Sequence, residues 1–137
     1  MAKVGVAGII PRGKTVLVLR RSKTDAFLPG AYDLPGGGLD PGEAPEDGIV
    51  REVLEETGLQ VSAVRSMGTR SYVLSDTGTN DKLLISFILK VEEGVFDVTL
   101  SEEHDFFRWV SDSDLDEIFE EGDLMGRIIH EYFSSVR

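Results

Sequence analysis

The sequence predicts a layered α/β or α+β sandwich in which helices pack around one β-sheet. Two observations predict this class. Apolar, β-branched segments recur along the chain between turn residues, as expected for strands, and segments with helical signals stand among them. A length of 137 residues with 41% apolar content fits one domain, residues 1–137, with a single core.

The first predicted elements are strands. Residues 4–10 and 15–21 are apolar, and the turn residues Pro11, Arg12 and Gly13 lie between them, so the two segments are predicted to form a hairpin. A short strand is expected over residues 31–34. The following Pro-Gly-Gly-Gly run, residues 35–38, is expected to interrupt both regular structures.

A helix is predicted over residues 43–57. Pro45 lies near its first turn, and the acidic residues Glu46 and Asp47 stand beside the positive end of its dipole. Gly58 occupies the position at which a helix commonly ends in a left-handed residue. The helix therefore has both a start and a stop signal in the sequence.

The rest of the chain alternates strand and helix signals. Residues 61–75 and 82–92 are predicted strands joined by a polar turn, and residues 106–110 form a shorter strand. Two segments that begin with acidic residues, 111–121 and 122–136, are predicted helices. No internal repeat or low-complexity linker divides the sequence.

The charge balance restricts the partners. Asp and Glu total 25 against 14 Lys and Arg, a net charge of −11, which argues against nucleic acid and against an anionic membrane surface. No run approaches the roughly 20 apolar residues that cross a bilayer. The chain has no cysteine and no signal-like N-terminus, so we expect a cytoplasmic protein. A phosphate-bearing substrate would need a metal ion to mediate.

The predicted helix over residues 43–57 has a carboxylate face opposite an apolar face. At about 100° per residue, one arc holds Glu52, Glu55 and Glu56 and the other holds Ile49, Val50, Val53 and Leu54. Like charges at these spacings cost a few tenths of a kcal/mol per pair unless a cation is present. A divalent cation such as Mg²⁺ satisfies such a cluster, and a solvated acidic face is the alternative.

The spacing around these glutamates resembles a known family. Gly37, Glu43 and Arg51, followed by the run Glu52 to Leu59, match every fixed position of the signature of the Nudix hydrolases. The match covers residues 37–59 directly. The early hairpin, the Pro-Gly-Gly entrance and the late acidic loop before a tryptophan strand agree more loosely. The resemblance implies an α/β/α sandwich around a mixed sheet with a loop–helix–loop metal site.

The resemblance also implies roles for individual residues. Glu52 and Glu56 would be the main ligands of Mg²⁺, or of Mn²⁺ in its place, with Glu55 in reach. Gly36 and Gly37 would let a backbone carbonyl face the ion, although an ordinary glycine turn is the alternative. Two further residues would support the site as scaffold, Glu43 acting through Arg51.

Residues outside the signature supply a general base and substrate contacts. Some relatives take the base from a late loop, so Glu103, and after it Glu102, is a candidate, while His104 is expected to be structural or on the surface. Basic residues close to the expected site could meet phosphates or be solvated, and aromatic residues could stack on a base or pack in the core. These candidates are Arg20, Arg21 and Lys23 for phosphate and Phe27 and Tyr32 for the base.

The predicted activity is Mg²⁺-dependent hydrolysis of a phosphoanhydride bond in a nucleoside diphosphate linked to another moiety. A nucleoside triphosphate or a modified nucleotide, cleaved to the monophosphate and pyrophosphate, is the preferred substrate. An ADP-ribose or nucleotide-sugar pyrophosphatase is the nearest alternative, and a catalytically silent nucleotide-sensing or partner-binding module is the alternative of another class. The intact set of glutamates argues against the silent module. The sequence leaves the base of the nucleotide, the leaving group and the oligomeric state open, a homodimer included.

Overall fold

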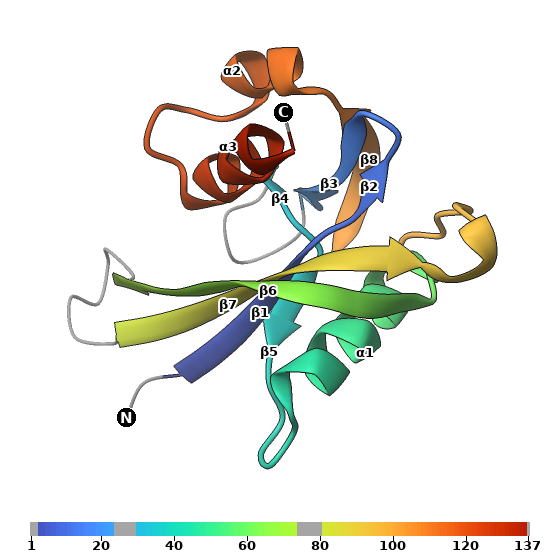
Figure 1. Cartoon of the computed structure of the whole chain (residues 1–137), viewed down its shortest axis with the longest axis vertical. Coiled ribbons are helices and arrows are strands. Elements are labelled where there is room, and N and C mark those ends of the chain that lie inside the picture. Colours follow the sequence, from blue (N-terminus) through green and yellow to red (C-terminus); the bar gives the residue numbers. More distant parts are fainter. Residues whose placement is uncertain (1–2, 24–29, 74–80, 137) are drawn as a thin grey trace.

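The computed structural model describes residues 3–23, 30–73 and 81–136. Two four-stranded sheets form its centre, with α1 on one side and α2 and α3 on the other (Figure 1). The strands are β1 (Lys3–Ile9), β2 (Pro11–Arg12), β3 (Thr15–Arg21), β4 (Tyr32–Asp33), β5 (Gly36–Gly38), β6 (Val61–Val73), β7 (Asp81–Val91) and β8 (His104–Val110). The helices are α1 (Pro45–Thr57), α2 (Leu115–Ile118) and α3 (Leu124–Ser135), with 3₁₀ turns at Glu92–Gly94 and Asp112–Asp114.

The first sheet is mixed, in the order β5-β1-β7-β6. Strands β1 and β7 are parallel, from Lys3 opposite Lys82 to Ile9 opposite Ile88, whereas β5 and β6 run antiparallel to their neighbours. The second sheet is antiparallel, with β3 between its neighbours. Helices on both sides of a mixed sheet confirm the predicted fold class, but the strands form two sheets where one was expected.

The predicted hairpin between residues 4–10 and 15–21 is wrong. Strand β1 pairs with β5 and β7 in the first sheet, and β3 lies in the second sheet. A short hairpin remains between β2 and β3, through Pro11 opposite Val16 and Arg12 opposite Thr15. The reason is burial, because an apolar strand such as β1 is more stable in the interior of a sheet next to a parallel partner than at an edge.

The glycine run does not interrupt regular structure as expected, because Gly36–Gly38 forms β5 and pairs with β1. The absence of side chains permits this pairing. A Cβ atom on Gly36 would lie only 2.0 Å from the backbone oxygen of Val6. The glycines therefore bring the loop backbone into the sheet, directly beside α1.

Helix α1 starts and ends near its sequence signals. Pro45 begins the helix, and Gly58 ends it in the left-handed conformation, φ 72°, donating its N–H to the Leu54 carbonyl. The expected start at Glu43 is two residues early. Glu43 instead closes a turn by donating its N–H to the carbonyl of Asp40. Glu43 therefore lies in the loop before α1, and its side chain contacts Arg51 on the helix.

Two apolar clusters fill the spaces on either side of the sheets. One lies against α1 and includes Leu17, Ile49, Val53 and Phe87. The other lies against α2 and α3 and includes Val16, Ile88, Ile128 and Phe133. Each cluster contains residues of both sheets. Apolar packing fixes the position of α1 through the helix face opposite the exposed side chain of Glu55.

The C-terminal part contains shorter helical elements than predicted. The segment 111–121 forms a 3₁₀ turn and the short α2 rather than one helix, and the strand before it begins at His104 rather than at residue 106. Asp123 caps α3, accepting from the N–H groups of Met125 and Gly126. Within the described ranges, every helix is too short or too polar to cross a membrane.

Candidate functional site

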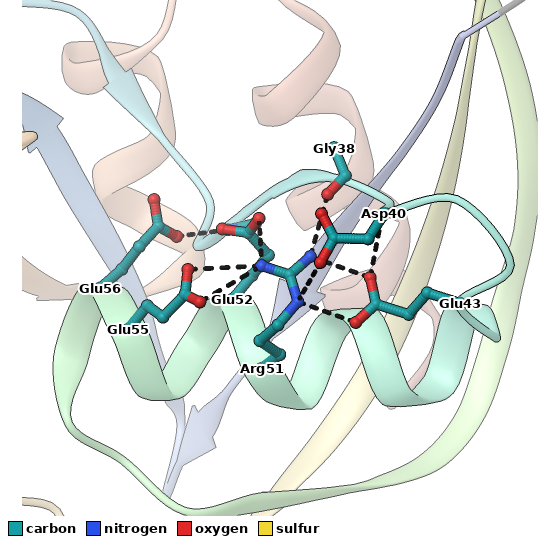
Figure 2. A network of polar contacts seen from close by, with 8 residues as sticks. Gly38, Asp40, Glu43, Arg51, Glu52, Glu55 and Glu56 are labelled. Carbon is teal, nitrogen blue, oxygen red and sulfur yellow. Dashed lines mark hydrogen bonds and ion pairs between the residues drawn. The ribbon is translucent and has the colours of Figure 1, made fainter.

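Helix α1 presents three of its glutamates, Glu52, Glu55 and Glu56, at different depths beside β5. Glu56 is buried, with 4% of its surface exposed, Glu52 is partly buried, and the Glu55 side chain is 58% exposed. Figure 2 shows Glu52 and Glu55 beside the guanidinium of Arg51, with Glu56 farther along α1. The predicted apolar arc needs one correction, because Leu54 is 48% exposed. The buried face is rotated toward Glu56, since β5 covers that flank of the helix.

The backbone N–H and C=O groups of β5 face in two directions, some toward β1 and the others toward α1. Gly8 donates its N–H to the Pro35 carbonyl, and Leu39 donates to the Val4 carbonyl. Backbone groups of an antiparallel strand alternate in direction, so Gly37 also faces β1.

Gly36 and Gly38 consequently point away from β1 and toward α1. The N–H of Gly36 donates to Oε1 of Glu56 at 2.7 Å, and the carbonyl of Gly38 accepts from Nη2 of Arg51 at 3.1 Å. The N–H and C=O of one strand residue point in the same direction, which places the Gly36 carbonyl on the side of Glu56.

The missing side chain of Gly37 leaves space for the carboxylate of Glu52, whereas that of Gly36 leaves space for the backbone of β1. A Cβ atom at this position would lie 2.6 Å from the carboxyl carbon of Glu52. Any larger residue would displace Glu52. The glycine run thus provides one backbone contact for Glu56 and an open space for Glu52.

Arg51 connects the loop to the helix. Its Nε and Nη2 donate to the two oxygens of Glu43 at 2.8 and 2.9 Å, while Nη1 donates to Glu52 at 3.1 Å and to Glu55 at 3.3 Å (Figure 2). Its hydrogen bonds hold the pKa of Glu43 down to about 2. One guanidinium therefore contacts four carboxylates, since its Nε also lies 3.5 Å from Oδ2 of Asp40, and its two shortest bonds go to Glu43, which lies outside the α1 cluster.

Burial and crowding make the remaining negative charge costly. Burial raises the pKa of Glu56 to about 9; the Gly36 N–H opposes this shift, while Asp33, Glu52 and Glu103 add to it. Burial also raises the pKa of Glu52, against the effect of Arg51. A bound cation would remove this penalty.

The loop before β8 brings a further carboxylate to the same place. Ser22 donates its N–H to the carbonyl of Glu103, and Ser101 donates its N–H to the carbonyl of Glu56, so the loop is fixed to both sides of the site. The ligand atoms of Glu56, Glu103 and His104 lie within 4.8 Å of one another. Glu102 is also exposed but is not part of this group.

His104 is interior rather than on the surface, with 1% of its side chain exposed. Its Nε2 lies 3.1 Å from Oδ1 of Asp33, and Oδ2 of Asp33 lies 3.1 Å from Nε of Arg21. Sequence analysis did not single out Asp33. The sequence signal for Asp33 was its position two residues before the Pro-Gly-Gly-Gly run.

The basic and aromatic candidates separate in the structure. Arg20 donates to Asp105 at 2.9 Å and stacks on Phe106, whereas Arg21 lines a cavity together with Tyr32. Lys23 is exposed. Phe27 lies outside the described residues.

This cavity has a volume of about 470 Å³ and lies next to β5. Its lining includes Gly36, Gly37, Gly38, Arg21, Tyr32, Asp33, Tyr72, Lys82, Leu84, Asp123 and Met125. Tyr72 and Asp123 were missed in the sequence because nothing local connects β6 or the start of α3 with the glycine run. A larger hollow of about 780 Å³ lies against Lys14, Tyr132 and Val136, and no candidate residue lines it.

Comparison with known proteins places this arrangement in a family. The family model of the NUDIX domain matches residues 1–132. A nucleoside triphosphatase NudI of Enterobacter sp. (strain 638) is 31% identical over 112 residues, which cover 77% of this chain and 79% of that protein. The crystal structure of a MutT protein from Methanosarcina mazei Go1 superposes with a TM-score of 0.77 at 32% identity, covering 98% of this chain and 94% of that one.

A third relative matches over a shorter stretch. An ADP-ribose pyrophosphatase of Methanocaldococcus jannaschii is 42% identical over 64 residues, covering 47% of this chain and 36% of that protein. The similarity to this relative is thus higher but confined to about half of the chain.

Proposed function

The chain belongs to the Nudix hydrolases, enzymes that cleave acid anhydrides, and on that premise we propose that it converts a nucleoside triphosphate or a modified nucleotide to the monophosphate and pyrophosphate with Mg²⁺. The observation that carries the proposal is the position of the carboxylates. Glu52 and Glu56 contact the same strand, Gly36–Gly38, that lines the 470 Å³ cavity. A cation at the carboxylates would therefore lie next to a substrate in the cavity.

The residues of the site fit a hard divalent cation. Oxygen donors from Glu52, Glu55 and Glu56 and the Gly36 carbonyl are the ligand type that Mg²⁺ prefers, and Mn²⁺ accepts the same donors. Gly37 leaves the space in which the Glu52 carboxylate lies. Burial is the largest cause of the raised pKa values of Glu52 and Glu56, and for Glu52 it outweighs the opposing effect of Arg51.

Different residues have different roles in the hydrolysis. A divalent cation, when bound, neutralises the diphosphate and polarises its phosphorus. Glu103 accepts the proton of the attacking water as the new P–O bond forms and the anhydride P–O bond breaks. Arg51, held by Glu43, acts as a positioning residue that fixes Glu52 and Glu55.

The cavity offers a place for the nucleoside. A volume of about 470 Å³ lies within the range of small-molecule sites. Tyr32 and Tyr72 both line it and provide aromatic surface for a base. Of the two arginines, Arg21 is assigned to the phosphates because it lines the cavity, where its Nε also contacts Asp33 at 3.1 Å, whereas Arg20 contacts Asp105 and is not part of the lining.

The alternative substrates are ADP-ribose and nucleotide sugars. The match to the ADP-ribose pyrophosphatase favours them, but it covers only 47% of this chain. The match to the nucleoside triphosphatase covers 77% and favours the triphosphate.

A substrate panel tests the proposal. Nucleoside triphosphates, oxidised nucleotides, ADP-ribose and nucleotide sugars are incubated with Mg²⁺ and the products resolved by chromatography. We expect a monophosphate and pyrophosphate from a triphosphate, no turnover by Glu56→Gln, and wild-type turnover by Glu46→Gln, a matched change at an exposed position of α1. Turnover of ADP-ribose alone would select the alternative, and equal turnover by Glu56→Gln would overturn the metal site.

A further inference from the structure

The imidazole of His104 has one nitrogen without a partner among the described residues. Its side chain is 1% exposed, and Nδ1 is buried without a hydrogen bond. Leaving a buried polar atom unpaired destabilises the folded protein, so such an atom needs an explanation. The nearest described carboxylate oxygen that faces it is Oε2 of Glu56, at 3.8 Å, too far for a hydrogen bond.

Asp33 determines which nitrogen carries the proton. Its ionised carboxylate can only accept hydrogen bonds, so Nε2 of His104 is the donor in the 3.1 Å contact. In the neutral ring, Nδ1 then has a free lone pair. A carboxylate behind a histidine in this way is the arrangement that orients metal-binding imidazoles.

Carboxylates lie close to this nitrogen, with Oε2 of Glu56 3.8 Å from Nδ1. Ligand atoms of His104, Glu56 and Glu103 lie within 4.8 Å of one another. Two bonds of about 2.1 Å to one ion place their donor atoms about 3.0 to 3.4 Å apart at right or tetrahedral angles. The 3.8 Å between Nδ1 and Oε2 therefore needs only a small contraction, and the exposed Glu103 is free to complete the group.

We propose that His104 Nδ1, Glu56 and Glu103 form a cation subsite with a nitrogen ligand, which binds Mn²⁺, Co²⁺ or Zn²⁺ in preference to Mg²⁺. The inference rests on the proposed function, since it extends the same carboxylate site. Imidazole suits these transition metals, whereas Mg²⁺ is bound almost entirely by oxygen. Glu103 has two carboxylate oxygens, so binding an ion through one leaves the other for the water proton.

The direct test detects nitrogen at the bound ion in the intact protein. Mn²⁺ is added to unlabelled protein and to protein containing ¹⁵N-histidine, and electron spin-echo envelope modulation is recorded. We expect ¹⁴N modulation in the first sample and its replacement by ¹⁵N modulation in the second. Labelling leaves the fold unchanged, so the result does not depend on whether a buried histidine can be replaced.

Two substitutions identify the histidine. His104→Gln removes the nitrogen signal, whereas His130→Gln, at the chain's other histidine and exposed on α3, keeps it. Calorimetric titration with Co²⁺ and Mg²⁺ gives the preference. His104→Gln is expected to lower Co²⁺ affinity about 10- to 100-fold and to leave Mg²⁺ affinity nearly unchanged, and Asp33→Asn is expected to act in the same direction.

The outcomes separate this inference from the proposed function. Mn²⁺ that binds without nitrogen modulation overturns the histidine subsite and leaves the proposed function in place. Protein that binds neither Mn²⁺ nor Mg²⁺, even with a non-hydrolysable nucleotide present, overturns the proposed function and the subsite together.

Discussion

The guanidinium of Arg51 and the carboxylate of Glu43 meet through two hydrogen bonds, Nε to Oε2 at 2.8 Å and Nη2 to Oε1 at 2.9 Å. This bidentate pair fixes Arg51 from the loop side and leaves Nη1 directed at Glu52 and Glu55. The loop before α1 therefore controls the position of the carboxylates on α1.

Replacing Arg51 with lysine should weaken cation binding. A lysine cannot make the bidentate contact with Glu43 and reach Glu52 at the same time, although it keeps the charge. We expect Arg51→Lys to lower Mg²⁺ affinity about tenfold, the usual effect of losing a group that orients metal ligands. Calorimetric titration measures this, with Arg127→Lys on α3 as the control; an unchanged affinity would show that Arg51 does not position the site.

Acid should weaken the same contact. The pKa of Glu43 is lowered from 4.5 to about 2 by Arg51, so its ionised form is stabilised in the folded protein. This contribution is complete above pH 4.5 and is lost as the pH falls toward 2. We expect the free energy of unfolding, measured with urea, to decrease less over that range in Glu43→Gln than in the wild type, and parallel curves would contradict the assignment.

Glu56→Gln should stabilise the protein when no divalent cation is present. The pKa of Glu56 is raised from 4.5 to about 9, so ionisation opposes folding, and stability is lost as the pH rises from 4.5 to 9. In EDTA at pH 8 we expect the variant to melt about 5 °C higher than the wild type, and at pH 4 the two should agree.

Adding Mg²⁺ to those samples supplies the control. The wild type should gain stability because the cation binds only the folded carboxylates, whereas Glu56→Gln should gain little. A variant that responds to Mg²⁺ as strongly as the wild type would place the cation away from Glu56.

The three glycines of β5 should respond differently to alanine. At Gly36 the new Cβ would meet the Val6 oxygen at 2.0 Å, so β5 separates from β1 and the protein is destabilised. At Gly37 it would meet the Glu52 carboxylate, so the fold is kept and cation affinity decreases. Gly38 has no described atom within 4 Å of that position and serves as the control.

Melting temperature and Mg²⁺ titration together distinguish the three variants. Gly36→Ala is expected to lower the melting temperature most, Gly37→Ala to lower affinity most, and Gly38→Ala to change neither. Equal behaviour of Gly37→Ala and Gly38→Ala would mean that Glu52 does not depend on the space at residue 37.

Tyr72 should affect substrate binding more than catalysis. It lines the cavity, and the hydrogen bonds described for Glu43, Glu52 and Glu56 do not involve it. We expect Tyr72→Ala to raise KM about tenfold with kcat nearly unchanged, because a stacked base loses its aromatic partner. Tyr132→Ala, at a tyrosine that lines the other hollow, is the control; a fall in kcat alone would remove Tyr72 from base recognition.

Local features were predictable because they depend on neighbours in the sequence. Pro45 and Gly58 act through their own backbone angles and hydrogen bonds, so α1 was placed within two residues. The carboxylates follow from helical spacing, which puts residues 52, 55 and 56 on adjoining positions of one helix.

Strand pairing and burial were decided only by the tertiary structure. Whether β1 pairs with β3 or with β5 and β7 depends on which arrangement buries more apolar surface. The apolar pattern of residues 4–10 is compatible with either pairing. The same holds for Glu56, whose helical position indicated exposure until β5 covered it.

The sequence by itself determined a helix with a cluster of three glutamates, residues 52, 55 and 56, next to a glycine loop, because caps and helical spacing act over a few residues. The tertiary structure alone decided how those charges behave. It buried Glu56 under β5 and brought Asp33 and His104, 71 positions apart, into contact. Such contacts form only when the sheets assemble, since they depend on apolar packing between segments that are distant along the chain.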